Sequence, residues 1–556
     1  MKPMLGCGTL ATSDHEPPST GHIQDRPDQQ QTGLCTLDST LKQSKVMDAN
    51  PSPPTASDIF RYRYQHGANL GSIFVLEKWL HPKMFEKDAQ GSSELEAVKQ
   101  SLKKNGLLAT RQKWEHHWQF ALTEADLIWL TDTAKCNSIR LPIGHFTLGP
   151  HFCKGTPFEG ETSQVYINAW SAVKDIIKNC HGHGIGVLID LHALPGGANI
   201  NAHSGTNTGK AELWTSEHYL KVAKDCIRFV VQEILTDRLS NVIGVELCNE
   251  PSRAASSAVF KWYDDVLTMV KTIDPSLPIY IGDCWDLPTA IKYALAKNNL
   301  EKASNPIIVD THKYYTFAAH DHAQAPQQII ERVKTSLGDI TKNQGSIASR
   351  KTTLAVYIGE YSCTMDGKTW SKVDAEHRPA LTQQFGRAQT NKWQDVTSGS
   401  AFWTLKMNWM DGGDWGFKKQ VKTGAVVPPR GLTFSFDKIK TKCREANACK
   451  EQLRTTALTQ HANYWDKKSS STKYEHRRYE RGYDLGFSDA IAFLCSRIEG
   501  KLPNTCQVAG GDRIGALELW IGKRMIEAEQ LGSSFGWEWE HGYRKGVTDF
   551  EKLVYT

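Results

Sequence analysis

The sequence contains no long hydrophobic run, since no stretch approaches the ~18–20 consecutive apolar residues that span a bilayer. Its first twenty residues hold one lysine, no apolar core and early acidic residues, which is the pattern of neither a secretory signal nor an arginine-rich transit peptide. Neither sign of charge predominates, because 66 Lys and Arg residues face 61 Asp and Glu residues for a net charge of +5. These absences predict a soluble protein that has no transmembrane segment and binds no nucleic acid.

Cysteine is present but has no framework pattern. The 13 cysteines are odd in number and scattered, and no CxxC pair or Cys/His cluster has the spacing of a zinc site. The sequence also has no N-x-S/T glycosylation site, because Asn50 is followed by Pro51. We therefore expect free thiols in a reducing, intracellular and cytoplasmic location, and neither a metal nor another cofactor.

Three segments of the chain differ in composition. Residues 1–57 are rich in Pro, Ser, Gln and Asp and show no period, which predicts a disordered tail. Residues 58–435 alternate short apolar strands with helical patterns, which predicts a (β/α)8 barrel with loop insertions, and residues 436–556 are helical in pattern. A doubly wound sheet is the alternative, but it rarely places polar residues at the ends of so many strands. The strand candidates are residues 65–71, 137–143, 184–192, 241–250, 278–283, 306–314, 353–361 and 400–407.

Two of these strands deliver a carboxylate at the carboxyl end. The segment NVIGVELCNEP ends with Glu250 and TLAVYIGEYS contains Glu360, each after a run of β-branched and aliphatic residues typical of a buried parallel strand. A (β/α)8 barrel keeps its chemistry at this end. Two carboxylates over one pocket are what glycosidic bond cleavage needs, because one protonates the leaving oxygen and the other attacks the anomeric carbon.

Further polar or aromatic side chains stand at the ends of the predicted strands. Each alone is as well explained by a structural role, but in a barrel all of them converge on one face. The set comprises Asn69, Arg140, His192, Asn249, Glu250, His312, Tyr314, Glu360 and Trp403.

With these motifs in this order, the chain resembles glycoside hydrolase family 5, of the retaining clan A, and within it the fungal exo-β-1,3-glucanase branch. The matching segments run from about residue 65 to 417 and include GANLGSIFVLEKWL, IRLPIGHF, IDLHALPGG, ELCNEP, DTHKYY, IGEYS and FWTLKMN. The resemblance implies that Glu250 is the acid/base and Glu360 the nucleophile. It also implies that substrate contacts come from Glu77, Arg140, His192, Asn249, His312, Tyr314 and Trp403.

Elementary electrostatics assigns roles within this set. Arg140 beside Glu360 should favour the ionised nucleophile, and Tyr314 can donate a hydrogen bond to the same carboxylate. The charge of Glu360 should raise the pKa of Glu250, so that Glu250 holds the proton it must donate. Asn249 is placed to bond the sugar 2-hydroxyl, and Trp403 offers a flat face to the sugar ring, although barrel packing would also explain a tryptophan there.

One loop departs from the glucanase pattern. The segment PGGANINAHSG replaces a text that resembles PGSQNGFDNSG, so the family's clamp aromatic and an Asp that holds the terminal glucose are replaced by Asn201 and Ala202. Ala198 and His203 also differ, and we count His203 among the substrate contacts. Phe317, the other clamp aromatic, is present. We therefore expect lower activity on laminarin than on small β-glucosides.

The helical segment 436–556 contains an internal repeat. Gly-Tyr-x-x-Gly-x-x-Asp occurs twice, with its glycines at 482 and 486 and again at 542 and 546. Glycines four residues apart lie on one face of a helix and permit close approach of a second helix. We expect a helical bundle docked on the barrel, with a partner-binding or self-association module as the alternative.

The leading functional hypothesis is a retaining, exo-acting β-glucosidase that takes a carbohydrate or β-glucoside substrate. A second hypothesis is a cytosolic β-glucosidase of glucolipids such as steryl glucosides or glucosylceramide. A third, from another class, is a non-catalytic barrel used as a binding or scaffold protein. Loss of a catalytic carboxylate would indicate the third, and both carboxylates are present.

Overall fold

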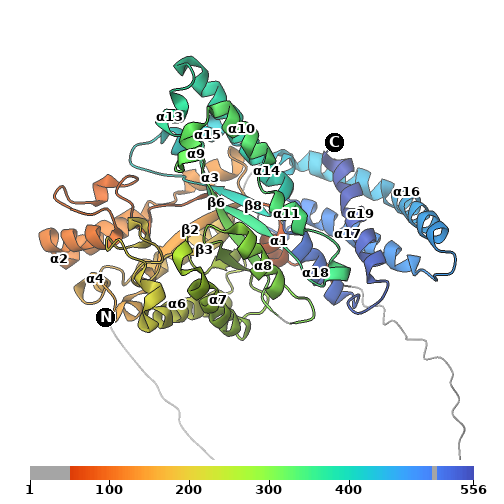
Figure 1. Ribbon diagram of the computed structural model, residues 1–556, viewed down its shortest axis with the longest axis horizontal. Helices are drawn as coiled ribbons and strands as arrows, with labels where there is room; N and C mark the ends of the chain where they lie inside the picture. Colours follow the sequence, from red (N-terminus) through yellow and green to blue (C-terminus); the bar gives the residue numbers. More distant parts are fainter. Residues whose placement is uncertain (1–50, 303, 504–509, 556) are drawn as a thin grey trace, which may run out of the picture. The chain divides into compact units, whose positions relative to one another are not determined.

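Eight parallel strands close into a barrel in sequence order, from β1 to β8 and back to β1, in a computed structural model that describes residues 51–302, 304–503 and 510–555 (Figure 1). This confirms the predicted (β/α)8 barrel and excludes the doubly wound sheet. The strands are β1 (Gln65–Asn69), β2 (Ser138–Gly144), β3 (Gly186–Ala193), β4 (Val242–Glu246), β5 (Ile279–Gly282), β6 (Ile307–Lys313), β7 (Val356–Tyr361) and β8 (Gly399–Phe402).

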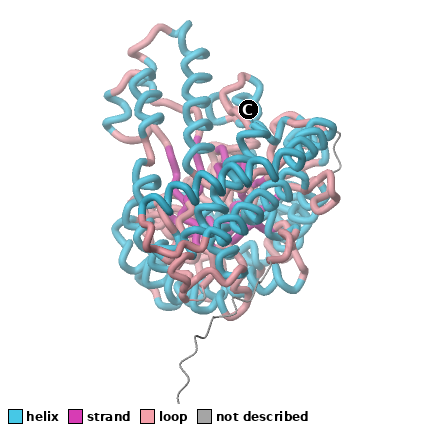
Figure 2. The backbone as a smooth tube through the Cα atoms, turned by 90° about the vertical axis from the view of Figure 1, so that its right-hand side faces the viewer, coloured by secondary structure: helices cyan, strands magenta, loops and turns pink. Residues whose placement is uncertain are grey.

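In the backbone view of Figure 2 the strands occupy the centre, and the helices lie around them. None of the helices described is both long and apolar enough to cross a membrane. The helices are α1 (Ala56–Tyr62), α2 (Glu94–Gln119), α3 (Glu124–Asp132), α4 (Glu161–Gln164), α5 (Ala169–Gly182), α6 (Glu217–Thr236), α7 (Ser256–Lys271), α8 (Leu287–Lys297), α9 (Ala319–Ala323), α10 (Pro326–Thr335), α11 (Gly338–Asn343), α12 (Ile347–Arg350), α13 (Gly367–Trp370), α14 (Arg378–Val396), α15 (Phe417–Lys422), α16 (Phe436–Lys468), α17 (His476–Cys495), α18 (Leu517–Glu527) and α19 (Gly536–Tyr555).

Local sequence explains why these segments fold as they do. Every residue of β3 is buried, because the strand is covered both by the barrel interior and by the outer helices. Helix α6 begins after Ser216, whose hydroxyl accepts a hydrogen bond from the backbone N–H of Tyr219. Its buried side chains recur every three or four residues, which is the spacing of one helix face: Ala223, Cys226, Ile227, Val230, Val231 and Ile234.

The N-terminal tail predicted for residues 1–57 falls mostly outside the described residues. Its last part does not: helix α1 begins at Ala56, with the Thr55 side chain and the Asp58 carboxylate capping the helix start reciprocally. Ile59 and Phe60 of this helix are fully buried. The barrel unit therefore begins before residue 58.

The C-terminal helices form the bundle that the repeat predicts. A Cβ atom on Gly486 of α17 would lie 2.3 Å from the carbonyl oxygen of Tyr543, and one on Gly546 of α19 would lie 2.3 Å from that of Tyr483. The two repeats thus pack backbone against backbone, which only glycine permits at these positions.

This bundle docks on the amino-terminal end of the barrel. Trp520 of α18 and Tyr543 of α19 share one apolar cluster with Leu188 and Tyr357 from the barrel strands. Around this cluster, the side chain of Glu518 accepts a hydrogen bond from the backbone N–H of Leu354, just before β7. The predicted docking is confirmed, and it leaves the carboxyl ends of the strands free for the site.

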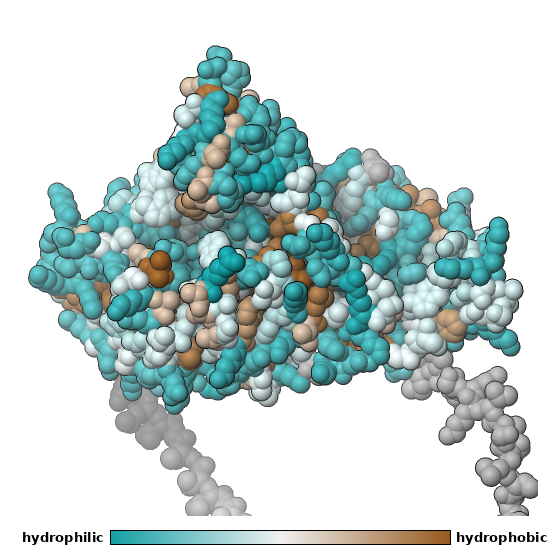
Figure 3. All heavy atoms as spheres, in the orientation of Figure 1, coloured by the Kyte–Doolittle hydropathy of each residue, from teal (hydrophilic) through white to brown (hydrophobic). Residues whose placement is uncertain are grey.

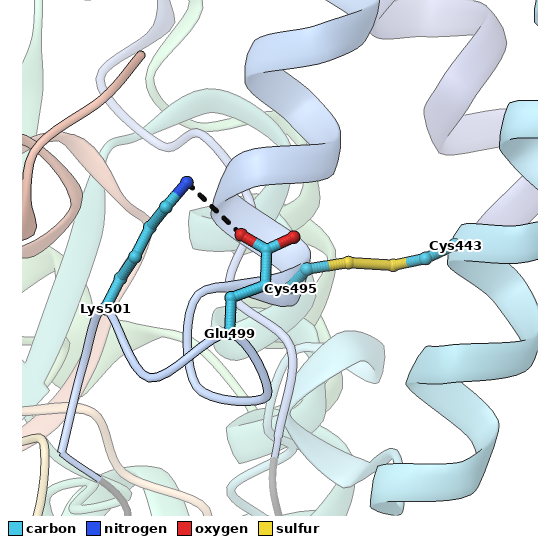
Figure 4. The surroundings of a disulfide bond; sticks show 4 residues. All are labelled: Cys443, Cys495, Glu499 and Lys501. Carbon is cyan, nitrogen blue, oxygen red and sulfur yellow. Dashed lines mark ion pairs between the residues drawn. A yellow bond between two sulfur atoms is a disulfide. The ribbon is translucent and has the colours of Figure 1, made fainter.

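One disulfide joins Cys443 of α16 to Cys495 of α17, near the ion pair between Lys501 and Glu499 (Figure 4). The expectation of free thiols is therefore wrong for this pair. Eight other cysteines of the described residues are free, and all but Cys449 are buried. The face of the molecule in Figure 3 is mostly hydrophilic, with hydrophobic residues in small scattered patches.

Candidate active site

Glu360 lies near the carboxyl end of β7 and is held by two neighbours. Its Oε1 accepts a hydrogen bond from Nη1 of Arg140 at 3.0 Å, and its Oε2 accepts one from the Tyr314 hydroxyl at 2.8 Å. Both contacts were predicted from the sequence. They fix the carboxylate in one orientation, as a nucleophile requires.

Arg140 is a fully buried hub under the floor of the cleft. Beyond Glu360 it is paired with Glu246 at 2.8 Å and with Asp190 at 3.0 Å, and it donates hydrogen bonds to the side-chain oxygens of Asn69 and Asn249. The surrounding carboxylates outweigh the effect of burial and raise its pKa further above the usual range. A buried guanidinium with this many acceptors is held in one orientation, and its hydrogen bond in turn fixes the position of the Glu360 carboxylate.

Glu246, Asp190 and Asp310 were not identified from the sequence as part of the site. They lie within buried strands β4, β3 and β6, and each contacts Arg140. A signal was present, because an acidic residue inside an otherwise apolar strand needs a buried partner. The arrangement of the strands in the barrel determines that the partner of all three carboxylates is Arg140.

Glu250 follows β4 in a left-handed backbone conformation, with φ of 42°. Non-glycine residues adopt this conformation rarely, and such strain is found most often at functional sites. His312 approaches Oε1 of Glu250 at 2.8 Å through Nδ1, and His203 approaches Oε2 at 3.2 Å through Nε2. The Asn199 amide donates to the backbone oxygen of Glu250 and holds the turn.

The two histidines reverse the expected ionisation of Glu250. Burial raises the pKa of this carboxyl, but the hydrogen bonds from His203 and His312 and their charge outweigh burial and hold it well below its usual range. Burial lowers the pKa of His203, but Glu250 outweighs this and raises it to about 9. The expectation that Glu360 keeps Glu250 protonated is therefore wrong for the ligand-free site, because the proton resides on imidazole instead.

The two carboxylates face each other across the cleft. One oxygen of Glu250, Nδ1 of His312 and one oxygen of Glu360 all lie within 4.8 Å of one another. Retaining glycosidases hold their carboxyl groups about 5–5.5 Å apart, whereas inverting enzymes leave about 6.5–9.5 Å for a water. An oxygen-to-oxygen approach within 4.8 Å agrees with the shorter separation of the retaining class.

Four further predicted residues present polar atoms or flat faces to the same cleft. Nδ1 of His192 is hydrogen-bonded to Asp190 at 2.7 Å, and the imidazole lies parallel to Trp403, with ring centroids 5.8 Å apart. Among the described residues, Nδ2 of Asn249 and Oε1 of Glu77 are buried without a hydrogen-bond partner. Unpaired buried polar atoms at a cleft are suited to a polyhydroxylated ligand, which would satisfy them.

The cleft has a volume of about 700 Å³. Of the predicted residues, Asn69, Arg140 and His312 do not line it. Arg140 and His312 contact the carboxylates directly, and Asn69 contacts Arg140. The sequence reasoning missed Trp79, Trp285 and Trp415 as lining residues. The lining side chains are Glu77, Lys78, Trp79, Ser92, His192, Asn201, Ala202, His203, Asn249, Glu250, Trp285, Tyr314, Phe317, Glu360, Trp403 and Trp415.

Aromatic residues form an exposed rim around this cleft. Phe317 is 67% exposed and Trp285 is 47% exposed, which is unusual for side chains of this size. Trp79 lies between Trp415 and Trp409, with ring centroids 5.2 and 6.1 Å away. The segment NWMDGGDWGF was a sequence signal for this rim, but nothing local to it indicates that it folds over the cleft.

Comparison with known proteins agrees with this site. The family described as "Cellulase (glycosyl hydrolase family 5)" matches residues 97–405, and the "Glucan 1,3-beta-glucosidase 3 C-terminal domain" matches residues 446–554. Glucan 1,3-beta-glucosidase 3 of Schizosaccharomyces pombe is 30% identical over 499 residues, which cover 89% of this chain and 97% of the relative. An uncharacterized glycosyl hydrolase of Saccharomyces cerevisiae is 29% identical over 520 residues, covering 90% and 95%.

Among solved structures, the rutinosidase of Aspergillus niger superposes with a TM-score of 0.50 at 18% identity, over 66% of this chain and 98% of that one, which shows a shared fold. The match to the family over most of the barrel, together with a relative of 30% identity that spans nearly the whole chain, shows that this protein belongs to glycoside hydrolase family 5 and is a glycoside hydrolase.

Proposed function

We propose that this protein is an exo-acting β-glucosidase that cleaves terminal β-glucosides with retention of configuration. The observation that carries the proposal is the pair Glu250 and Glu360, with carboxylate oxygens within 4.8 Å and each carboxylate held by its own partners. The names of the relatives support a glucoside substrate, because the S. pombe relative is a glucan 1,3-beta-glucosidase.

In the first step Glu360 attacks the anomeric carbon, the bond to the leaving oxygen breaks, and that oxygen takes a proton from Glu250. In the second step water attacks the glycosyl ester, Glu250 takes a proton from that water, and Glu360 leaves as a carboxylate. Arg140 and Tyr314 position the nucleophile through both steps. Two inversions give a β-configured product.

The proton for the leaving group is stored beside Glu250 in the resting enzyme. With His203 protonated and Glu250 ionised, the proton crosses the 3.2 Å contact from Nε2 of His203 to Oε2 of Glu250 as the substrate excludes water. Glu250 then passes it to the leaving oxygen. His203 in this scheme recharges the acid/base rather than touching the reacting bond.

The shape of the cleft supports small β-glucosides over long glucans. Glu77, His192 and Trp403 form a compact pocket for one sugar ring beside Glu360. Asn201 lines the cleft where an aromatic side chain would clamp the next glucose, and Ala202 lines it where an acidic side chain would help hold the terminal glucose. The remaining binding surface is the aromatic rim.

That rim favours a second candidate, a β-glucosidase of glucolipids. Trp79, Trp285, Phe317 and Trp409 are all more than 40% exposed. Large exposed aromatic surface beside a pocket typically binds an apolar partner. A flat apolar aglycone could lie across these rings while its glucose occupies the pocket.

The test uses purified full-length protein with an aryl β-glucoside, followed by proton NMR of the first sugar released. We expect β-glucose to appear before mutarotation, and Glu360→Gln to lose turnover while its melting temperature stays unchanged. An α-configured first product, or undiminished turnover by Glu360→Gln, would contradict the proposal. Comparing laminarin oligosaccharides with a steryl glucoside in detergent then decides between the two substrate classes.

A further inference from the structure

Three side chains from three different helices of the C-terminal bundle converge on one point, away from the catalytic cleft. They are His461 of α16, His476 at the start of α17 and Glu538 of α19. Nε2 of His461 lies 3.0 Å from Oε2 of Glu538, and Nδ1 of His476 lies 2.9 Å from the same oxygen. The three atoms lie within 4.8 Å of one another.

This cluster differs from the other groups of possible ligands in the described residues. Two of those groups contain His312 with Glu250, Glu360, Glu246 or Asp310, and they belong to the catalytic cleft. The third, at Asp374, Glu376 and His377, consists of exposed residues. The C-terminal cluster instead has a Glu538 with no exposed surface and a His461 that is 9% exposed.

The distances suit a small tetrahedral cation. Zinc binds imidazole nitrogen and carboxylate oxygen at about 2.0–2.2 Å, so neighbouring ligand atoms around it are roughly 3.3 Å apart. The observed contacts of 3.0 and 2.9 Å are shorter by a few tenths of an ångström. Small side-chain rotations would therefore admit the ion. Two histidines and one glutamate are a ligand set that zinc accepts, with a water in the fourth position.

The second layer of contacts orients the ligands as in known metal sites. Nε2 of His476 is hydrogen-bonded to Oδ1 of Asp466 at 3.0 Å, which leaves Nδ1 to face the cluster. A carboxylate on the outer nitrogen of a histidine is the usual support of a metal ligand. The other oxygen of Glu538 accepts the backbone N–H of Glu475 at 2.7 Å. Nε2 of His476 and Oε1 of Glu538 are thus occupied by these outer partners. Nδ1 of His476 and Oε2 of Glu538 face each other in the cluster.

The surroundings provide a rigid wall and an entry path. Tyr479 stacks on the His461 ring with centroids 4.0 Å apart, and Trp537 lies 5.9 Å from the same ring. On the other side the His476 side chain is 22% exposed and that of Asp466 is 62% exposed, so an ion and its water can enter from there.

We propose that His461, His476 and Glu538 form a zinc site that ties α16, α17 and α19 together. His461 and His476 are 77 and 62 residues from Glu538 along the chain, so the sequence contains no short motif that indicates the site. Its role is structural: the ion joins the last part of α16 to the starts of α17 and α19, two helices that already pack against each other through the glycine repeats. It is independent of the proposed function, because the bundle docks at the opposite end of the barrel.

The test is a cobalt titration of the full-length protein after chelator treatment and dialysis. We expect the visible absorption of tetrahedral cobalt to saturate at one ion per chain and to disappear when zinc is added. Zinc should also raise the melting temperature of the dialysed protein by several degrees, because the ion binds only the folded state. Absence of both the absorption and the shift in the unmodified protein would overturn the proposal.

Variants locate the site. His476→Ala and Glu538→Gln should lose the cobalt absorption and the zinc-dependent shift, while aryl glucoside turnover persists. His541→Ala is the matched control, because His541 is also on α19 and its ring lies 6.4 Å from that of His461 without belonging to the ligand set. Glu360→Gln should keep the absorption, which excludes binding in the catalytic cleft. Absorption that survives in both ligand variants would place the ion elsewhere and refute the assignment.

Discussion

Nε2 of His203 lies 3.2 Å from Oε2 of Glu250, so the loop that departs most from the glucanase pattern supplies a direct neighbour of the acid/base. His312 contacts the other oxygen of the same carboxylate. An imidazole on each oxygen changes where the catalytic proton is stored. It also makes the pH dependence of the enzyme a property of the cluster rather than of Glu250 alone.

His203→Asn should therefore change the pH profile. With the pKa of His203 raised to about 9, the wild-type cluster keeps its proton until the pH approaches that value. Without His203, the alkaline limb of kcat/KM should move to lower pH, and more so for an alkyl glucoside than for a nitrophenyl glucoside, whose leaving group needs little protonation. Identical profiles for the two proteins would show that His203 does not supply the proton.

Stability provides a second readout of the same pair. Because the pKa of His203 is higher in the folded state than in the unfolded chain, its contribution is complete below about pH 6.5 and is lost as the pH rises through about 9. Chemical denaturation across this window should show a decline for wild type that is smaller for His203→Asn. A parallel decline in both would assign the change to other groups.

The loss of activity in Glu250→Ala should depend on the leaving group of the substrate. Loss of a general acid costs about 10²–10⁴-fold where protonation is needed. We expect a loss of this size on alkyl glucosides and a much smaller loss in the first step on dinitrophenyl glucosides. Azide should restore turnover and yield a β-glucosyl azide, because Glu360 still forms the covalent intermediate. Equal losses on both substrates would contradict the acid role.

Asn201→Phe should alter substrate preference. The side chain lines the cleft beyond the first sugar, where an aromatic ring would stack on a second glucose. We expect kcat/KM on laminarin oligosaccharides to rise by about tenfold, in line with the ~1–3 kcal/mol of one apolar contact, and aryl glucoside turnover to change little. Ile200→Phe is the control, since Ile200 is 65% exposed and does not line the cleft. An equal rise of kcat/KM in both variants would contradict the idea that an aromatic ring at position 201 stacks on the second glucose.

Gly486→Ala should destabilise the protein without altering specificity. The added Cβ would lie 2.3 Å from the carbonyl oxygen of Tyr543, so α17 and α19 must separate, at a cost of about 1–3 kcal/mol. Gly182→Ala is the matched control, because Gly182 is also helical and a Cβ there meets no atom within 4 Å. The melting temperature should fall for the first variant and hold or rise for the second. A similar melting temperature for both would refute the close contact.

Alkylation without a reductant tests the cysteines. In denaturant we expect Cys449 to be labelled and Cys443 and Cys495 to remain unlabelled until reduced, since the last two form the disulfide. We still propose an intracellular location, which the composition of the chain favours. Secretion of a tagged protein would contradict that proposal, whereas labelling of Cys443 in unreduced protein would contradict the disulfide.

Much of the catalytic layout follows from the order of the strands. In a parallel barrel every strand delivers its carboxyl end to the same rim, so Glu250, Glu360, Arg140 and Tyr314 could be placed together once eight alternating units were recognised. The glycine repeat likewise predicts close helix packing, because a residue without Cβ at i and i+4 has a purely local steric consequence. Both features follow from patterns that repeat along the sequence, namely the alternation of strands with helices and the spacing of the glycines, and such patterns can be recognised in a single chain.

Only the tertiary structure decided the ionisation and the rim of the site. The pKa of Glu250 depends on which side chains approach its two oxygens, and His203 reaches one from the segment after β3 while His312 reaches the other from β6. The same holds for Arg140, whose partners come from five other strands or their ends, and for His461, His476 and Glu538 in the bundle. Electrostatic energy depends on distances of a few ångströms, and those are set by folding rather than by spacing along the chain.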